Sequence, residues 1–242
     1  RKTNLDLPPV NPVTAIDWNV EERRNTGMGT SHMAPWFAEL AALTNPIRRE
    51  FHLMTLLSGS RPTALKNVRI EHIDFRSRLL HIPKPKGGVK KAFDIPLSRP
   101  MIRCILRAMR AGRVLSPDQA EFWLFPADSD SGHLIEHKEE RKVLSKWGND
   151  LRQSYRTLAQ AAGVSELDIH LLMNHSLPGV NAGYITRDSL LHDHLRKQQE
   201  RISKVIIDSA KGKTDGPDLS WLHKGKVATL RVRPEEELKA AA

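Results

Sequence analysis

The stretch "NPIRREFHLMTLLSGSRP", residues 45–62, predicts a helix whose two ends are both marked, followed at once by a tight turn. Asn45 suits the N-cap, Pro46 the first helical position, and Gly59 the C-terminal end. Arg61 precedes a proline, and a residue in that place is disfavoured in helical geometry. We therefore expect Arg61 to lie in the turn between two helices.

The sequence on both sides of this stretch is mainly helical in pattern. "PWFAELAAL" predicts a short helix before it, and further helices are predicted at residues 99–112, 134–147, 150–163, 165–175 and 188–208. Between them, "VRIEHIDF", "RLLHIPKPK" and "KAFDIPL" predict three short strands, the last two joined around Gly87 and Gly88 as a hairpin. The predicted fold class is mainly α with a small antiparallel β-sheet (α+β).

Composition divides the chain into three predicted parts. Residues 1–30 are rich in proline, asparagine and charge, which is typical of an N-terminal linker or arm. Residues 31–210 form the predicted domain, and residues 211–242, which open with "KGKTDGPD", a flexible C-terminal tail. The chain begins without a methionine, so we expect it to be part of a longer protein.

The charge of the chain indicates a polyanionic partner. Lysine and arginine number 38 against 28 aspartate and glutamate residues, a net charge of +10. Double-stranded DNA or another nucleic acid is the leading candidate, and an acidic membrane surface the weaker one. The single Cys104 excludes an internal disulfide framework and suits a reducing compartment, and no apolar run approaches the ~20 residues of a membrane span. We therefore expect a cytoplasmic, nucleoid-associated protein without a membrane partner.

Five residues with phosphate chemistry follow one another in order. They are Arg61 in "SGSRP", Lys86 beside the predicted hairpin turn, Arg152 in "NDLRQSYRT", His175, and Tyr184 nine positions later in "HSLPGVNAGY". Taken singly each is weak, because charged side chains are mostly exposed and tyrosines mostly pack in cores. The order and the spacing make the set informative.

In this order the sequence resembles the tyrosine recombinase, or phage integrase, family. That family has an arginine in a "TGxR"-like turn, a lysine on a β-hairpin, an "HxLR" helix, and "LGH" followed nine residues later by a tyrosine. The matching words here are "SGSR", "KPKGG", "NDLR" and "MNH", and the resemblance runs from about residue 10 to 205. It implies the catalytic domain of a site-specific DNA recombinase that uses neither metal nor other cofactor. It also implies a homo-tetramer on DNA, accessory DNA-bending proteins as further partners, and an N-terminal domain upstream of this chain.

The resemblance gives each residue an expected role. Tyr184 attacks a phosphodiester and forms a 3′-phosphotyrosine, while Arg61, Arg152 and His175 hold the phosphate oxygens, where charge builds up. Lys86 gives a proton to the leaving 5′-hydroxyl. Lys84 is the alternative, because two extra residues separate Lys86 from "IPLS" relative to shorter family hairpins.

Two positions depart from the family pattern. Asn149 stands where the family most often has histidine, on the same helical face as Arg152. An amide can bind phosphate but cannot accept a proton as a general base, so we expect slower chemistry. Ala64 stands where a carboxylate commonly orients the first arginine, and Asp74 is a candidate replacement.

Other interpretations stay open at this stage. The chain could be a non-catalytic or decayed DNA-binding protein of the same fold, or a type IB topoisomerase-like strand transferase. "HLIEH" (133–137) matches a zinc-peptidase pattern, but such short matches are frequent by chance. Tyr155 and His170 are expected to pack in the domain. The apolar stripe of the last helix either packs on its own domain or docks on a neighbouring protomer.

Overall fold

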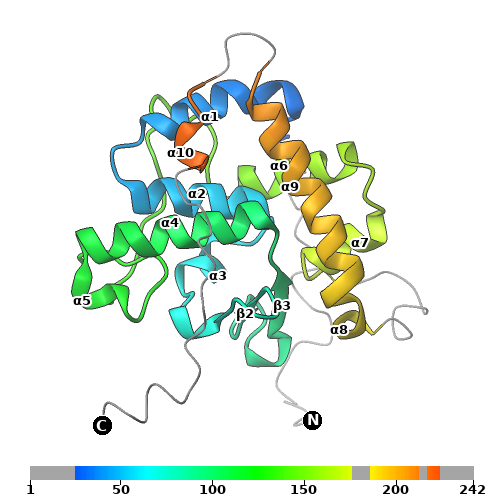
Figure 1. Cartoon of the computed structure of the whole chain (residues 1–242), viewed down its shortest axis with the longest axis horizontal. Coiled ribbons are helices and arrows are strands. Elements are labelled where there is room, and N and C mark those ends of the chain that lie inside the picture. The colour runs from blue at the N-terminus through cyan, green and yellow to red at the C-terminus, as the bar shows by residue number, and fades with distance from the viewer. Residues whose placement is uncertain (1–24, 176–185, 213–216, 224–242) are drawn as a thin grey trace, which may run out of the picture.

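The computed structural model describes residues 25–175, 186–212 and 217–223, and within these ranges it is mainly helical with one small antiparallel sheet (Figure 1). This confirms the predicted α+β class. The strands are β1 (Ile73–Asp74), β2 (Leu79–Ile82) and β3 (Phe93–Pro96). The helices are α1 (Met33–Ala42), α2 (Pro46–Ser58), α3 (Pro62–Lys66), α4 (Arg99–Leu115), α5 (Pro117–Ala120), α6 (Asn149–Ala161), α7 (Glu166–Leu172), α8 (Arg187–Leu190), α9 (Arg196–Ala210) and α10 (Ser220–His223).

Helix α2 is the centre of the domain and has the ends that the sequence predicts. The Asn45 side chain accepts hydrogen bonds from the backbone N–H groups of Ile47 (2.9 Å) and Arg48 (3.2 Å). Gly59 ends the helix in the left-handed conformation, with φ of +61°. Residues 50–58 are all buried, and α2 packs against α4 on one side and α6 on another. The segment that leads into Arg61 is therefore held on all sides.

The sheet has the order β1-β2-β3, with both pairs antiparallel. β2 and β3 form the predicted hairpin, in which Leu80 faces Ile95 and both side chains are buried. The first predicted strand is much shorter than expected, because Ile70–His72 forms a 3₁₀ turn and Arg69 instead bridges to Trp123. The hairpin lies at the lower edge of the helical body in Figure 1, and β3 contacts the turn that follows α8.

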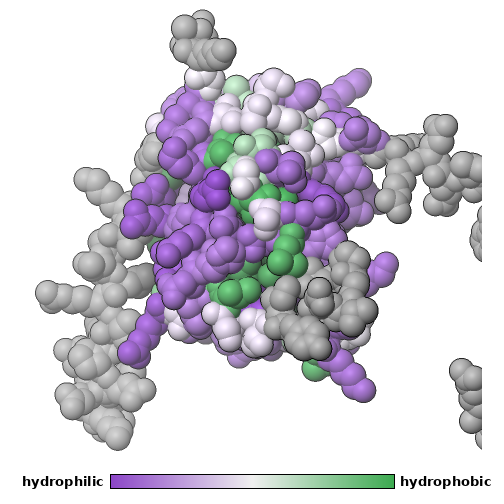
Figure 2. All heavy atoms as spheres, turned by 90° about the vertical axis from the view of Figure 1, so that its right-hand side faces the viewer, coloured by the Kyte–Doolittle hydropathy of each residue, from purple (hydrophilic) through white to green (hydrophobic). Residues whose placement is uncertain are grey.

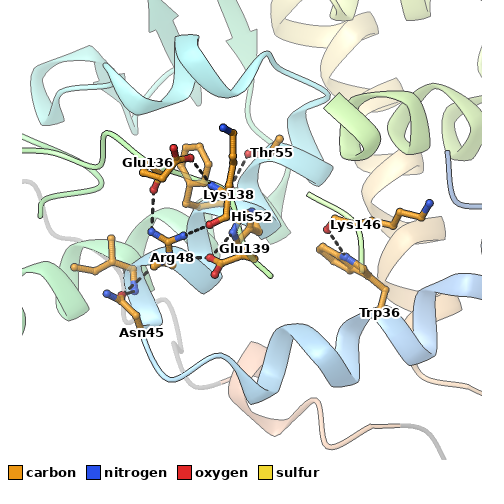
Figure 3. A network of polar contacts seen from close by, with 11 residues as sticks. Trp36, Asn45, Arg48, His52, Thr55, Glu136, Lys138, Glu139 and Lys146 are labelled. Carbon is orange, nitrogen blue, oxygen red and sulfur yellow. Dashed lines mark hydrogen bonds and ion pairs between the residues drawn. The ribbon is translucent and has the colours of Figure 1, made fainter. Parts of the chain in front are cut away.

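The helix predicted at residues 134–147 does not form, and that prediction is wrong. Figure 3 shows the reason, which is a network around Arg48 of α2. Its guanidinium donates to the carbonyls of Glu136 (2.8 Å) and Lys138 (2.7 Å) and to the Glu139 carboxylate (2.7 Å). Lys66 donates to the carbonyl of Ile135. These carbonyls would serve as acceptors within a helix, so the tertiary contacts hold the segment in an irregular, non-helical conformation instead.

The apolar stripe of the last helix is buried within its own domain. A π-helical turn (Leu191–Leu195) joins α8 to α9, and α9 packs against α1, α2, α4 and α6. Of the predicted stripe, Val205 is only partly buried and the other members are buried: Leu191, Leu195, Ile202 and Ile206. The face over α6, α7 and α9 is accordingly mostly hydrophilic, with a few patches of hydrophobic residues among the hydrophilic ones (Figure 2). The structure thus favours packing on the own domain over docking on a neighbour through this stripe.

A short piece of the predicted tail also packs on the domain. Leu219 and Leu222 are buried, and the Trp221 ring lies beneath the guanidiniums of Arg49 (4.6 Å) and Arg107 (5.3 Å). Arg107 also forms a two-point ion pair with the fully buried Glu50. Residues 217–223 of the predicted tail therefore contact the domain near α4. Within the described ranges no helix is long and apolar enough to span a bilayer.

Candidate functional site

Arg61 occupies the turn predicted for it. It is the N-cap of α3 in an extended conformation (φ −68°, ψ 135°), and its carbonyl accepts hydrogen bonds from the N–H groups of Ala64 and Leu65. Its side chain is half-buried and forms neither a hydrogen bond nor an ion pair within the part of the chain that the structure describes. The backbone is thus fixed, while the guanidinium keeps its donors for a ligand.

Arg152 lies on α6 and reaches across to both neighbouring segments. It donates to the carbonyl of Gly59, to that of Met173 (3.1 Å), and to Nε2 of His175 (2.5 Å). A guanidinium has five N–H groups, so two remain for a ligand. Arg152 therefore connects the turn of Arg61 with the segment that carries His175.

The two arginines and His175 influence one another electrostatically. Burial, and then repulsion from Arg61, lowers the pKa of Arg152 to about 10, so it stays charged at neutral pH. Burial, followed by repulsion from Arg152, His170 and Arg61, lowers the pKa of His175 to about 4. Among the described residues no carboxylate forms an ion pair with Arg61 or Arg152. The result is two uncompensated positive charges beside a neutral imidazole, which favours an anionic ligand.

We expect the imidazole of His175 to stay neutral from pH 7 down to about pH 5 in the DNA-free protein. Its folded pKa of about 4 lies below the ordinary 6.5. The unfolded chain therefore binds the proton first, and His175 makes folding less stable as the pH falls from 6.5 toward 4. An NMR titration of the ring signal, assigned with His175→Gln, measures this directly. A midpoint near 6.5 would contradict the arrangement.

The hairpin lysines are exposed. Lys86 and Lys84 both lie on the connection between β2 and β3, and the described contacts include none that ties either side chain to Arg61 or Arg152. The far end of this connection does approach the site, because the Asn174 side chain donates to the carbonyl of Lys91 (3.3 Å). Sequence reasoning missed Lys91, and the only signal for it was its place in the same lysine-rich hairpin.

The two family departures have different surroundings. Asn149 is exposed at the first position of α6, so a larger side chain fits there without displacing the core. Ala64 is partly buried against the core. Asp74 does not take the place of the missing carboxylate, because it accepts from the N–H groups of Arg76 (2.8 Å) and Ser77 (2.9 Å) in the β1–β2 turn.

Tyr184 lies outside the described residues, but the chain on both sides of its segment is fixed. On one side is His175. On the other, Arg187 donates from Nε to the carbonyl of Leu171 (3.0 Å) and from Nη2 to that of Asp94 (2.5 Å). Arg187 thereby fastens the start of α8 to the end of α7 and to β3. This role of Arg187 was not predictable from the sequence, because carbonyl acceptors cannot be located from residue types.

The discounted motifs have structural roles in the described ranges. His133 stacks on Trp123 with ring centroids 4.2 Å apart, and His133 and His137 do not share a helix. The described residues contain no group of three or more His, Cys, Asp or Glu side chains that could hold a metal ion. Tyr155 is fully buried, as predicted.

Comparison with known proteins shows similarity to integrases in sequence and in fold. No profile of a known protein family matches the chain. It is 28% identical over 182 residues to the prophage integrase IntF of Escherichia coli (strain K12), which covers 72% of this chain and 38% of that protein. The chain thus spans about two fifths of the length of this relative. Its fold is similar to that of the integrase from mycobacterium phage Brujita, with a TM-score of 0.50, 16% identity, and coverage of 83% of this chain and 69% of that one.

Proposed function

From its similarity to phage integrases in sequence and in fold, we propose that this chain is the catalytic part of a tyrosine-type site-specific DNA recombinase. The observation that carries the proposal is that Arg61, Arg152 and neutral His175 interact electrostatically, while no carboxylate among the described residues forms an ion pair with either arginine. A phosphodiester supplies the negative charge that this arrangement lacks. Its non-bridging oxygens suit the remaining guanidinium donors.

The proposed reaction is a phosphoryl transfer that conserves the phosphodiester bond. The Tyr184 oxygen attacks phosphorus and gives up its proton to water, a P–O bond to the tyrosine forms, and the P–O bond to the 5′-oxygen breaks. The 5′-oxygen takes a proton from Lys86, or from Lys84, and leaves as a hydroxyl. The 3′-phosphotyrosine keeps the energy of the original bond, so attack by the 5′-hydroxyl of another strand rejoins DNA without ATP.

Arg61 and Arg152 act where charge develops in this reaction. The five-coordinate phosphorus has more negative charge on its non-bridging oxygens than the starting diester, and preorganised donors stabilise it more than the ground state. Neutral His175 accepts from Arg152 through Nε2, which leaves Nδ1 as its N–H donor. Three side chains thus offer hydrogen-bond donors to one phosphate.

Exposed Asn149 gives a direct test of how far this site departs from its relatives. We expect Asn149→His to raise the rate of DNA cleavage at least about tenfold, because imidazole can accept the tyrosine proton and an amide cannot. Single-turnover cleavage at saturating DNA measures the effect, and Asn149→Gln is the matched control that enlarges the side chain without adding a base. Equal rates for Asn149→His and Asn149→Gln would refute this role for the position.

The same proposal extends to partners. We propose that the chain binds double-stranded DNA, assembles as a homo-tetramer on two duplexes with accessory DNA-bending proteins, and acts in the cytoplasm on the nucleoid. Because phosphate contacts dominate the binding of DNA, affinity is expected to fall steeply with salt. The predicted organisation is an arm over residues 1–30, the catalytic domain over 31–210, and a tail beyond.

The test is to trap and locate the covalent intermediate. The protein is incubated with nicked suicide substrates that carry candidate sites, and the denatured adduct is digested with trypsin. Cleavage after arginine places Tyr155 on the peptide 153–156 and Tyr184 on the peptide 157–187, so the two tyrosines of the chain separate. A nucleotide on peptide 157–187 is the expected result. No adduct on a verified site would favour a non-catalytic DNA-binding protein, and relaxation of supercoils without a specific site would favour a topoisomerase-like enzyme.

A further inference from the structure

A buried amide lies behind the two arginines of the proposed site. Gln199 of α9 is fully buried, and its Oε1 accepts from the Tyr155 hydroxyl at 2.8 Å. Its Nε2 donates to the carbonyl of Leu57 at 2.7 Å and to Oγ of Ser203 at 3.4 Å. The Leu57 carbonyl can only accept a hydrogen bond, so it must face the Nε2 group of Gln199 and not the amide oxygen. This contact fixes the orientation of the amide. All of its hydrogen-bonding groups are used inside the core.

One hydrogen-bond partner of the Gln199 amide, the carbonyl of Leu57, lies shortly before Arg61 in the chain. Leu57 lies in the last turn of α2, where backbone carbonyls have no partner within the helix. Gln199 supplies the missing donor. Two residues after Leu57 comes Gly59, whose carbonyl accepts from Arg152, and two residues later comes Arg61. The amide therefore holds the end of α2 directly before the segment that presents the first guanidinium.

The other partner leads to Arg152. Tyr155 lies on α6 three residues after Arg152, and its ring lies against Gly59, where an added Cβ would come within 2.3 Å of the ring. Its hydroxyl is held by Gln199. The amide thus connects the backbone at the end of α2 with the side chain that packs α6 against it. In Figure 1, α9 passes alongside α6 and the end of α2, as this contact requires.

We propose that Gln199 is a positioning residue that sets the placement of Arg152 relative to Arg61, and so links the helix that follows the Tyr184 segment to the phosphate site. For its effect on reaction rate this inference rests on the proposed function. The proposed placement of Arg152 relative to Arg61 does not depend on that function, because it concerns the described residues alone. A buried amide suits this task, since its hydrogen bonds are directional and a purely apolar contact allows the helices to slide.

The variant Gln199→Met tests the proposal, because methionine has a similar length and no amide. It leaves the Tyr155 hydroxyl and the Leu57 carbonyl without partners, so the single variant loses stability as well. The companion variant Gln199→Met with Tyr155→Phe removes the unpaired hydroxyl and recovers part of that stability, while the connection stays broken. Ile206→Ala is the matched control, because it makes a cavity beside the same helix without touching the amide.

The first readout is the pKa of His175, measured by NMR on the DNA-free protein. In the wild type it is held near 4 partly by repulsion from Arg152 and Arg61. We expect it to rise toward 6.5 in Gln199→Met and in the double variant, because Arg152 moves away, and to stay low in Ile206→Ala. An unchanged value in both Gln199 variants, or an equal rise in Ile206→Ala, would overturn the proposal.

The second readout is the rate of adduct formation at saturating DNA, taken at a temperature where circular dichroism shows every variant folded. Misplacement of a reacting group by about 1 Å costs up to ~10²-fold, so we expect both Gln199 variants to be about 10–100-fold slower, with unchanged DNA affinity. Recovery of the wild-type rate in the double variant would mean that Gln199 only stabilises the fold. If the wild type forms no adduct, the proposed function fails, and the NMR comparison still decides the positioning role.

Discussion

Tyr184→Phe is expected to abolish the covalent protein–DNA adduct and to leave DNA affinity unchanged. Phenylalanine has no oxygen to attack phosphorus, and the chain has no second tyrosine that can take over. The only other one, Tyr155, is fully buried, donates its hydroxyl proton to Gln199, and has a pKa raised well above the ordinary range by burial. Adduct formation is therefore expected to fall below detection rather than to a reduced rate.

The measurement is a suicide-substrate assay resolved on a denaturing gel, with fluorescence anisotropy as the measure of DNA binding. Tyr155→Phe is the matched control, since it removes the same hydroxyl elsewhere; it is expected still to form the adduct, more slowly than the wild type because its contact with Gln199 is lost. An adduct that persists in Tyr184→Phe at wild-type yield excludes Tyr184 as the nucleophile. An adduct lost together with DNA binding would point to a defect in binding instead.

Arg152→Ala is expected to lower the rate of adduct formation by about 10²–10³-fold, the usual cost of removing one preorganised donor from a developing oxyanion. The loss is compounded because Arg152 also donates to the carbonyls of Gly59 and Met173 and to His175, so the site loses its internal connection. Arg152→Lys keeps the charge but lacks the planar fork, and it is expected to stay slow.

The matched control is Arg156→Ala, one turn further along α6. Arg156 is exposed and pairs with exposed Glu166 at 2.6 Å, a contact that contributes little to stability. Single-turnover rates at saturating DNA separate the chemical step from binding. Equal losses in Arg152→Ala and Arg156→Ala would mean that only general positive charge matters, and no loss in either would remove Arg152 from the reaction.

Local sequence signals predicted the ends of helices well. Asn45, Pro46 and Gly59 lie where α2 begins and ends, and the proline after Arg61 set the backbone of that arginine. These signals act within a few residues, so the sequence carries them directly. The helix expected at residues 134–147 failed because Arg48, nearly a hundred positions earlier, takes the carbonyls that a helix needs.

The site was predictable as a set of residue types in order, and not as an arrangement. The order predicted Arg61, Arg152 and His175, and the structure brings Arg152 and His175 into contact. The contact of Arg152 with the Gly59 carbonyl could not be predicted, because every residue has a backbone carbonyl and the sequence does not show which one accepts. Gln199 was hidden for another reason: a single polar residue on an amphipathic helix is more often solvent-exposed than buried. The catalytic roles of all six residues stay predictions: Arg61, Lys86, Asn149, Arg152, His175 and Tyr184.

The close contact of Gly59 with the Tyr155 ring limits the substitutions that this protein can accept during evolution. A side chain at position 59 would collide with the ring, and the backbone there is left-handed, so drift at this position is blocked while the tyrosine remains. A smaller residue at position 155 would free the space but release the hydroxyl that Gln199 holds. Substitutions at positions 59, 155 and 199 are therefore expected to be coupled, and lineages that keep one of these residues are expected to keep the other two.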